Sequence, residues 1–195
     1  MVQRRGVERR RAILDAAEAL LTEKGYEAAT LKAIGERAGI PTASMYHYFP
    51  DRHQVDAELL QQHMRALDAV VDTVLRDIGP GTVREIADAL IDVVLTYFRR
   101  HRSCTELWFA GRNEALDELV RTFDEAQAER LWLLLLERKL IAADTSRFVP
   151  QMAFEAANRL FDVAFRRSPD GDDATIDEAR RMLTAYFLTY APEDA

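Results

Sequence analysis

Residues 30–52, TLKAIGERAGIPTASMYHYFPDR, have the pattern of two short helices joined by a tight glycine turn. Thr30 is suited to cap the first helix, whose apolar residues then recur at helical spacing on one face. Gly39 can adopt the left-handed backbone conformation that a sharp turn requires, so the first helix should end there. This stretch therefore predicts a helix-turn-helix, an arrangement that can insert its second helix into a DNA groove.

The second helix of the pair should follow Pro41 and present a polar surface. Met45 and Phe49 stand four residues apart and are the expected inward positions, while small, hydroxyl-bearing and aromatic side chains occupy the other faces. Pro50 should end this helix, and Asp51 should cap the next one. A glycine-turned helix pair also occurs in all-α proteins that bind no nucleic acid, so the flanking sequence matters.

The sequence before the pair favours DNA binding. Apolar residues at helical spacing between Ile13 and Leu21, followed by Lys24 and Gly25, predict a first helix and hence a three-helix head. Ahead of it the arm QRRGVERRR carries five arginines and one glutamate and could neutralise phosphates. The alternative is that the arm is only a solvated terminus. Its arginines are Arg4, Arg5, Arg9, Arg10 and Arg11.

Residues 8–53 resemble the DNA-binding domain of the TetR family of bacterial transcriptional regulators. The resemblance rests on ILDAAEALLTEKGYEAATLKAIGERAGI, then SMYHYFPDR, with a long helix following directly, and it covers about a quarter of the chain. The family's remaining part is poorly shared between its members. Two departures are Pro41, where serine is frequent, and Arg52, where lysine is usual; proline suits a first helical turn and arginine binds phosphate well.

The resemblance implies a set of DNA contacts along the helix-turn-helix. They are Thr30 and Arg52 toward phosphate, Lys32 toward phosphate or groove, Thr42, Ala43 and Ser44 toward base edges, Tyr46 and His47 toward phosphates and the groove wall, and Tyr48 at the rim.

Length and charge are consistent with a small head and a larger second domain. The chain has 195 residues and is 48% hydrophobic, and we expect a DNA-binding domain at 1–53 and a helical domain at 54–195. The formal charge of −7 divides into +2 for residues 1–53 and −9 for the remainder. Any basic surface is therefore local, and DNA affinity should fall steeply with salt.

After Arg52 the sequence reads as helices without any alternating strand pattern, which predicts an all-α fold of about nine helices. No apolar run approaches the ~18 residues of a membrane helix, and the N-terminus lacks a signal-peptide core, so we expect a cytoplasmic protein. The helices expected after the head are 52–77, 83–100, 104–110, 114–139, 147–166 and 175–190.

The chemistry of an enzyme or a metal site is not evident in the sequence. The single Cys104 excludes a disulfide framework within one chain. His47, His53, His63 and His101 show neither H-x-x-x-H nor H-E-x-x-H spacing. No glycine-rich phosphate loop, G-x-S-x-G motif or Cys-His signature occurs. We therefore predict no catalytic residue, no metal and no cofactor.

The last two expected helices carry more apolar surface than one small domain needs. Such a pair predicts a four-helix bundle made by two copies of the chain, and the family resemblance implies the same; the alternative is a wide core face in a monomer. A palindromic operator read by two heads about one DNA turn apart, ~34 Å, also favours a homodimer. The expected interface residues are Phe154, Phe161, Phe165, Met182, Leu183, Tyr186 and Phe187.

The middle helices should enclose a regulatory ligand. Aromatic walls with a few polar groups suit a small, largely apolar molecule, and its binding would shift the fourth helix and release a repressor from its operator. Activation, ligand-independent regulation and a helical protein-interaction module remain the alternatives. The expected ligand-binding residues are His63, Met64, Leu67, Tyr97, Phe98, Trp108, Phe109, Phe123, Gln127 and Asn158.

Overall fold

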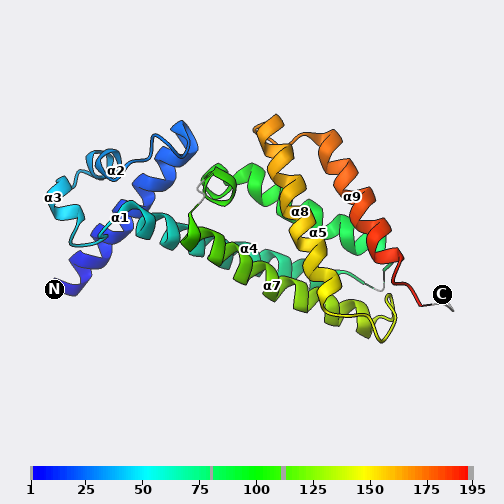
Figure 1. Ribbon diagram of the computed structural model, residues 1–195. Coiled ribbons are helices and arrows are strands. Elements are labelled where there is room, and N and C mark those ends of the chain that lie inside the picture. The colour runs from blue at the N-terminus through cyan, green and yellow to red at the C-terminus, as the bar shows by residue number, and fades with distance from the viewer. Residues whose placement is uncertain (1, 80, 111–112, 193–195) are drawn as a thin grey trace. The chain divides into compact units, whose positions relative to one another are not determined.

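The computed structural model describes residues 2–79, 81–110 and 113–192, with side chains for all of these except residues 2–4 and 110. This part of the chain forms nine α-helices and one π-helical turn and contains no strand (Figure 1). The predicted all-α fold is thus confirmed. Over the same residues, no helix has both the length and the apolar character needed to cross a bilayer.

The helices fall into two compact units, each built from segments that are distant in sequence. The first unit comprises Met1–Arg65 and His101–Val120, and the second comprises Ala66–Arg100 and Arg121–Ala195. Helix α4, Arg52–Asp77, contributes to both units. The domain limit that we place after residue 53 therefore falls in the first turn of a continuous helix.

In the first unit, helix α1 packs against α2 (Figure 1) and also against α6. The basic arm belongs to α1, because this helix begins at Val2, the second residue of the chain. The side chain of Arg4 lies outside the described part. The elements of this unit are α1 (Val2–Lys24), α2 (Leu31–Ala38), α3 (Thr42–Met45), the first half of α4, α6 (Arg102–Thr105), the π-helical turn η1 (Glu106–Ala110) and the start of α7 (Glu114–Glu137).

The turn between α2 and α3 forms as the sequence predicts. The Thr30 hydroxyl accepts a hydrogen bond of 3.1 Å from the Ala33 N–H, and Gly39 has a φ of 66°. Gly35 is a further requirement that the pattern analysis missed. A Cβ at this position would stand 3.0 Å from the Ile40 carbonyl oxygen and 3.1 Å from the Met45 side chain, so only glycine lets α3 approach α2 this closely.

The helix expected from Pro41 up to Pro50 is shorter than predicted. Only Thr42–Met45 is α-helical, and residues 46–48 form turns. The N–H groups of His47 and Tyr48 bond the carbonyls three residues earlier, at 3.2 and 2.9 Å, which tightens the chain away from α-helical geometry. Met45 and Phe49 are nevertheless fully buried, as expected.

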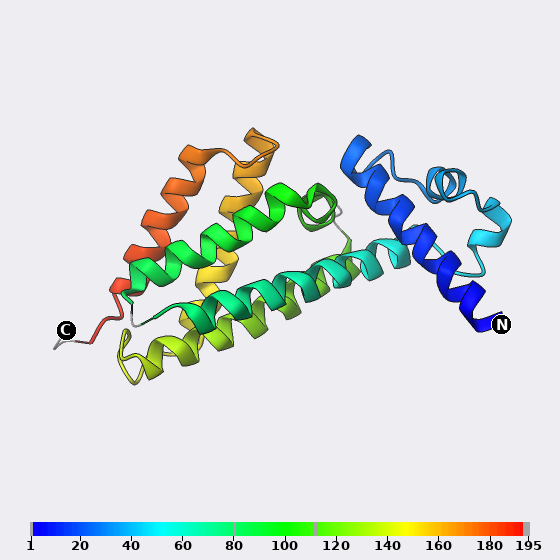
Figure 2. The same cartoon turned by 180° about the vertical axis from the view of Figure 1, so that it is seen from behind.

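In the second unit, α8 (Phe148–Arg167) and α9 (Asp173–Leu188) lie side by side and antiparallel, and α9 also packs on α5 (Val83–Arg100) (Figures 1 and 2). Arg180 joins α9 to Asp88 and Asp92 of α5. Arg130 of α7 forms ion pairs of 2.6 Å with Asp68 and 2.7 Å with Asp72. These pairs fix α7 against the second half of α4. Compared with the expected helices, the one at 104–110 divides into α6 and η1, and the others differ by two residues or fewer at each end.

Candidate nucleic-acid interface

The recognition segment, residues 42–48, is anchored from below and exposed above. Because Met45 and Phe49 are buried, Tyr46 and His47 between them project outward: Tyr46 is 56% exposed and His47 is also exposed. Ala43, before Met45, is exposed as well. Thr42, Ser44 and Tyr48 are partly buried. Thr30 and Lys32, at the start of α2, are exposed in the same unit. All nine predicted DNA contacts, Arg52 included, are thus at least partly exposed to solvent within a short length of chain.

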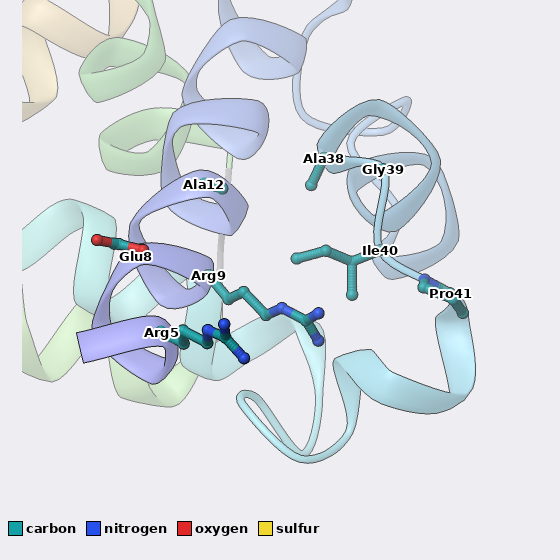
Figure 3. Close-up of a pocket in the computed structure, with 8 residues that line it drawn as sticks. All are labelled: Arg5, Glu8, Arg9, Ala12, Ala38, Gly39, Ile40 and Pro41. Carbon is teal, nitrogen blue, oxygen red and sulfur yellow. The ribbon is translucent and has the colours of Figure 1, made fainter. Parts of the chain in front are cut away.

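A shallow, basic pocket of about 290 Å³ opens between α1 and the α2–α3 turn (Figure 3). The guanidinium groups of Arg5 and Arg9 extend toward the side of Ile40, whereas Glu8 points the other way (Figure 3). Arg5 and Arg9 share one face of α1 because they stand four residues apart. The sequence indicates that both arginines could neutralise phosphates, with a solvated terminus as the alternative, but it does not predict that they lie together beside the turn. The other lining residues are Ala12, Ala38, Gly39 and Pro41.

Two other arginines of the head are occupied within the chain. Arg10 bonds the Glu58 carboxylate and the Tyr48 carbonyl, the latter at 2.9 Å, and its guanidinium lies 4.2 Å from the centre of the Phe49 ring. Arg37 pairs with Glu23 at 2.6 Å. Arg10 thus fastens α1 to the segment before α4. The head is therefore stabilised partly by arginines that could otherwise contact phosphate.

Arg52, a predicted phosphate contact, is also bonded inside the head. Its side chain is 18% exposed, its guanidinium lies 3.8 Å from the centre of the Tyr26 ring, and its Nε is 3.2 Å from the Asp56 carboxylate. The Tyr26 hydroxyl donates to the same carboxylate at 3.1 Å. Burial raises the pKa of Asp56, and the Arg52 charge and the Tyr26 hydrogen bond oppose that rise. DNA contact by Arg52 remains a prediction, while its role in holding Asp56 is visible.

The predicted ligand-binding residues divide between the two units. His63, Met64, Trp108 and Phe109 belong to the first unit, and the other six belong to the second. His63 is buried, and burial together with the nearby His101 lowers its pKa to about 4, so the imidazole is neutral at pH 7. In the second unit, the Phe98 ring packs edge-on against Phe161 and Phe165. Leu67, Tyr97 and Gln127 are buried there, and Phe123 and Asn158 are partly exposed.

Asp124 is a buried carboxyl of the second unit that the sequence analysis missed. It accepts a hydrogen bond from the Asn158 side chain. Burial is the main cause that raises its pKa to about 7; the Asn158 hydrogen bond opposes this and Glu155 adds to it. A polar pair of this kind, placed near Gln127 in sequence, is the sort of group that orients a bound ligand.

Replacing Asp124 with asparagine is expected to stabilise the protein at pH 8 but not at pH 4. The folded protein holds the Asp124 proton up to about pH 7, whereas the unfolded chain loses it near its ordinary pKa of 3.8, so stability falls as pH rises between these values. Asparagine removes this loss, on the order of 2 kcal/mol at pH 8. Urea unfolding at both pH values measures the effect. An equal change at both would contradict the assignment.

The predicted dimer residues on α8 and α9 differ in exposure. Phe161, Leu183 and Phe187 are 4, 7 and 5% exposed and belong to the core of one chain. Met182 is 44% exposed, and the remaining three, Phe154, Phe165 and Tyr186, are partly exposed. Other large apolar side chains exposed on these two helices are Phe148, Met152 and Leu188.

Comparison with protein families agrees with this architecture in both halves of the chain. Residues 13–59 match the model for bacterial regulatory proteins of the tetR family, and residues 82–187, more than half of the chain, match a tetracyclin repressor-like C-terminal domain. The chain belongs to the TetR family. It is therefore a helix-turn-helix transcriptional regulator that binds DNA, and not an enzyme. Members of this family typically dimerise and bind small-molecule ligands.

Individual TetR-family relatives show how far the similarity reaches. The transcriptional repressor KstR of Mycolicibacterium smegmatis is 37% identical over 65 residues, which is 33% of this chain and 32% of KstR. A TetR-family regulator from Streptomyces coelicolor is 32% identical, with a TM-score of 0.69 over 93% of this chain and 99% of that one. The fatty acid degradation regulator FadR from Bacillus halodurans shares the fold, with 18% identity, a TM-score of 0.71 and coverage of 90% and 94%.

Proposed function

We propose that this TetR-family chain is a homodimeric repressor that a small, largely apolar ligand releases from a palindromic operator. The observation that carries the proposal is the recognition segment, where buried Met45 and Phe49 hold Tyr46 and His47 outward. Small and hydroxyl-bearing residues at the start of α3 allow close approach to base edges. The basic pair Arg5 and Arg9 beside the turn suits contact with the DNA phosphate backbone next to the recognition segment.

The homodimer is supported by apolar side chains that a single chain leaves exposed. Monomeric proteins seldom expose several large apolar groups on two adjacent helices. Met152 on α8 and Met182 on α9 are 37 and 44% exposed, and Leu188 is 52% exposed. Pairing of α8 and α9 with their copies would cover these groups in a four-helix bundle.

Replacing Met182 with glutamate is expected to weaken dimerisation about 30-fold, because each dimer would bury two charges in an apolar interface at a total cost of about 2 kcal/mol. Sedimentation across a concentration series reports the change as a shift from two chains of 22.2 kDa to one. Leu133→Glu is the matched control, since Leu133 of α7 is 52% exposed in the same unit. An equal effect of both variants, or none from Met182→Glu, would argue against this interface.

The ligand's largely apolar character is supported by the second unit. Leu67, Tyr97 and Phe98 give buried apolar surface, and Asp124 with Asn158 gives one polar pair. Pockets for small molecules combine such walls with a few polar groups. FadR, which shares the fold, is named for fatty acid degradation. To act as an inducer, the ligand must bind the DNA-free arrangement more tightly than the DNA-bound one.

Selection from a random pool of double-stranded DNA tests the proposal on many candidate operator sequences at once. We expect enrichment of a palindrome whose half-sites stand about one helical turn, ~34 Å, or a multiple apart. Enrichment of a single half-site or of no sequence would contradict the proposed mode of binding. Screening apolar compounds for loss of the selected complex then separates a ligand-responsive repressor from a ligand-independent regulator.

A further inference from the structure

Three side chains with metal-binding atoms meet in the first unit, although they are far apart in sequence. Glu18 lies on α1, His63 lies on α4, and His101 directly precedes α6. Each offers one potential ligand atom, and these atoms all lie within 4.8 Å of one another. The His63 Nε2 is 3.9 Å from the Glu18 Oε1, and the centres of the two imidazole rings are 5.6 Å apart.

The spacing of these atoms is close to that of a metal site. Zinc is held by imidazole nitrogen and carboxylate oxygen at about 2.0–2.1 Å in tetrahedral geometry, which places two ligand atoms about 3.3 Å apart. The 3.9 Å between His63 Nε2 and Glu18 Oε1 exceeds this by less than 1 Å, and no separation in the cluster exceeds 4.8 Å, so side-chain rotations could bring the three atoms to this spacing. Two histidines and one glutamate form a complete set of protein ligands for a zinc ion that keeps one water.

The surroundings of the three residues also suit a cation. His63 is 6% exposed, and a neutral imidazole ring offers one nitrogen lone pair to a metal ion. Ser103 is buried, and its hydroxyl lies 3.0 Å from the His63 Nε2 and 3.5 Å from the Glu18 carboxylate. In this position the hydroxyl could bond a water on the ion, as the outer groups of metal sites do.

We propose that Glu18, His63 and His101 form a binding site for a divalent transition-metal ion of the zinc class. The ion would join three elements of the first unit: α1, α4 and the segment that leads into α6. Since α1 packs on α2 and Arg10 fastens it to the segment before α4, the ion would restrain the support of the recognition segment. The inference stands on these side chains alone and does not depend on the proposed ligand or dimer.

Cobalt and zinc titrations of the full-length chain, free of any histidine tag, test the site. Co²⁺ should bind one ion per chain and give the visible absorption of a four-coordinate complex, and Zn²⁺ should displace it. Zn²⁺, but not Mg²⁺, should raise the melting temperature, because the ion binds only the folded chain. The variants His101→Ala and Glu18→Gln should each weaken Co²⁺ binding at least ~10-fold.

The control is His53→Ala, which removes an exposed histidine of α4 that lies outside the cluster and should leave Co²⁺ binding unchanged. His101 and Glu18 are chosen over the buried His63 because both are only half-buried, so their replacement should disturb folding less. Circular dichroism verifies that each variant is folded. Absence of Co²⁺ binding to the wild-type chain would overturn the proposal. So would binding that both cluster variants retain at full affinity.

Discussion

Replacing Tyr46 with alanine is expected to lower operator affinity about 100-fold without lowering the melting temperature. Tyr46 is 56% exposed, so its loss leaves the core of the head intact. A contact to DNA is worth about 1–2 kcal/mol, and in a dimer the change occurs twice, which gives about 3 kcal/mol. Fluorescence anisotropy with labelled operator at fixed salt measures the affinity, and thermal unfolding followed by circular dichroism measures the stability.

Two further variants separate the causes of that loss. Tyr46→Phe keeps the ring and removes the hydroxyl, so an intermediate affinity would indicate a hydrogen bond to phosphate. Gln61→Ala removes an exposed polar side chain of α4 in the same unit and should bind like the wild type. Wild-type affinity for Tyr46→Ala would show that the exposed face of residues 42–48 is not the DNA surface.

Replacing Arg52 with alanine is expected to destabilise the protein by about 3 kcal/mol at pH 8. The substitution removes the guanidinium from the Tyr26 ring and leaves the Asp56 carboxylate, 1% exposed, without its cation. For a chain of this length, the melting temperature should fall by about 6–12 °C. Thermal unfolding at two pH values measures both the size of the effect and its electrostatic origin.

The loss should be smaller at pH 5 than at pH 8. Burial already raises the pKa of Asp56, and removal of Arg52 takes away the main influence that lowers it. The variant therefore takes up a proton on folding at a higher pH than the wild type does, and it loses stability relative to the wild type as pH rises through that range. The double variant Arg52→Ala with Asp56→Asn should recover much of the loss. A pH-independent loss that Asp56→Asn does not relieve would refute this account of Arg52.

The local features of the fold are predictable from sequence because their causes are local. The Thr30 cap, the left-handed Gly39 and the buried Met45 and Phe49 each follow from residue type and helical spacing, and the structure confirms them. The Asp51 cap is likewise confirmed, since its carboxylate accepts the Gln54 N–H at 3.0 Å. The sequence pattern predicts too long an α3 helix. It does not reveal that the N–H groups of His47 and Tyr48 bond the carbonyls three residues earlier, which ends the α-helical geometry.

The features that sequence could not supply depend on residues brought together by tertiary packing. Arg52 carries the charge of a phosphate contact, but its distance from Tyr26 and Asp56 is a property of the folded head. The H-x-x-x-H and H-E-x-x-H spacings detect histidines that share a helix. Glu18 and His101 lie on different elements, so no spacing rule brings them to His63.

The exposure of the apolar residues on α8 and α9 also could not be predicted from the sequence. Helical spacing identifies which residues are apolar, but not whether a given face turns toward the chain's own core or away from it. The sequence pattern groups Phe161 with Met182, and the structure separates them into a buried and an exposed side chain. The dimer variants are therefore best placed at the exposed positions.

The most direct test of the central claim is the binding of the purified protein to DNA from the region upstream of its own gene, titrated with salt and with unrelated competitor DNA. The account predicts a complex of two chains per site that resists competitor and weakens steeply as salt rises, since arginine and lysine displace counterions from phosphates. Protein that carries over a bound ligand is stripped by denaturation and refolding before the measurement. Two results would contradict sequence-specific recognition by this head. One is that competitor DNA dissociates the complex with the upstream region as readily as it dissociates a complex with random DNA. The other is that salt does not affect binding.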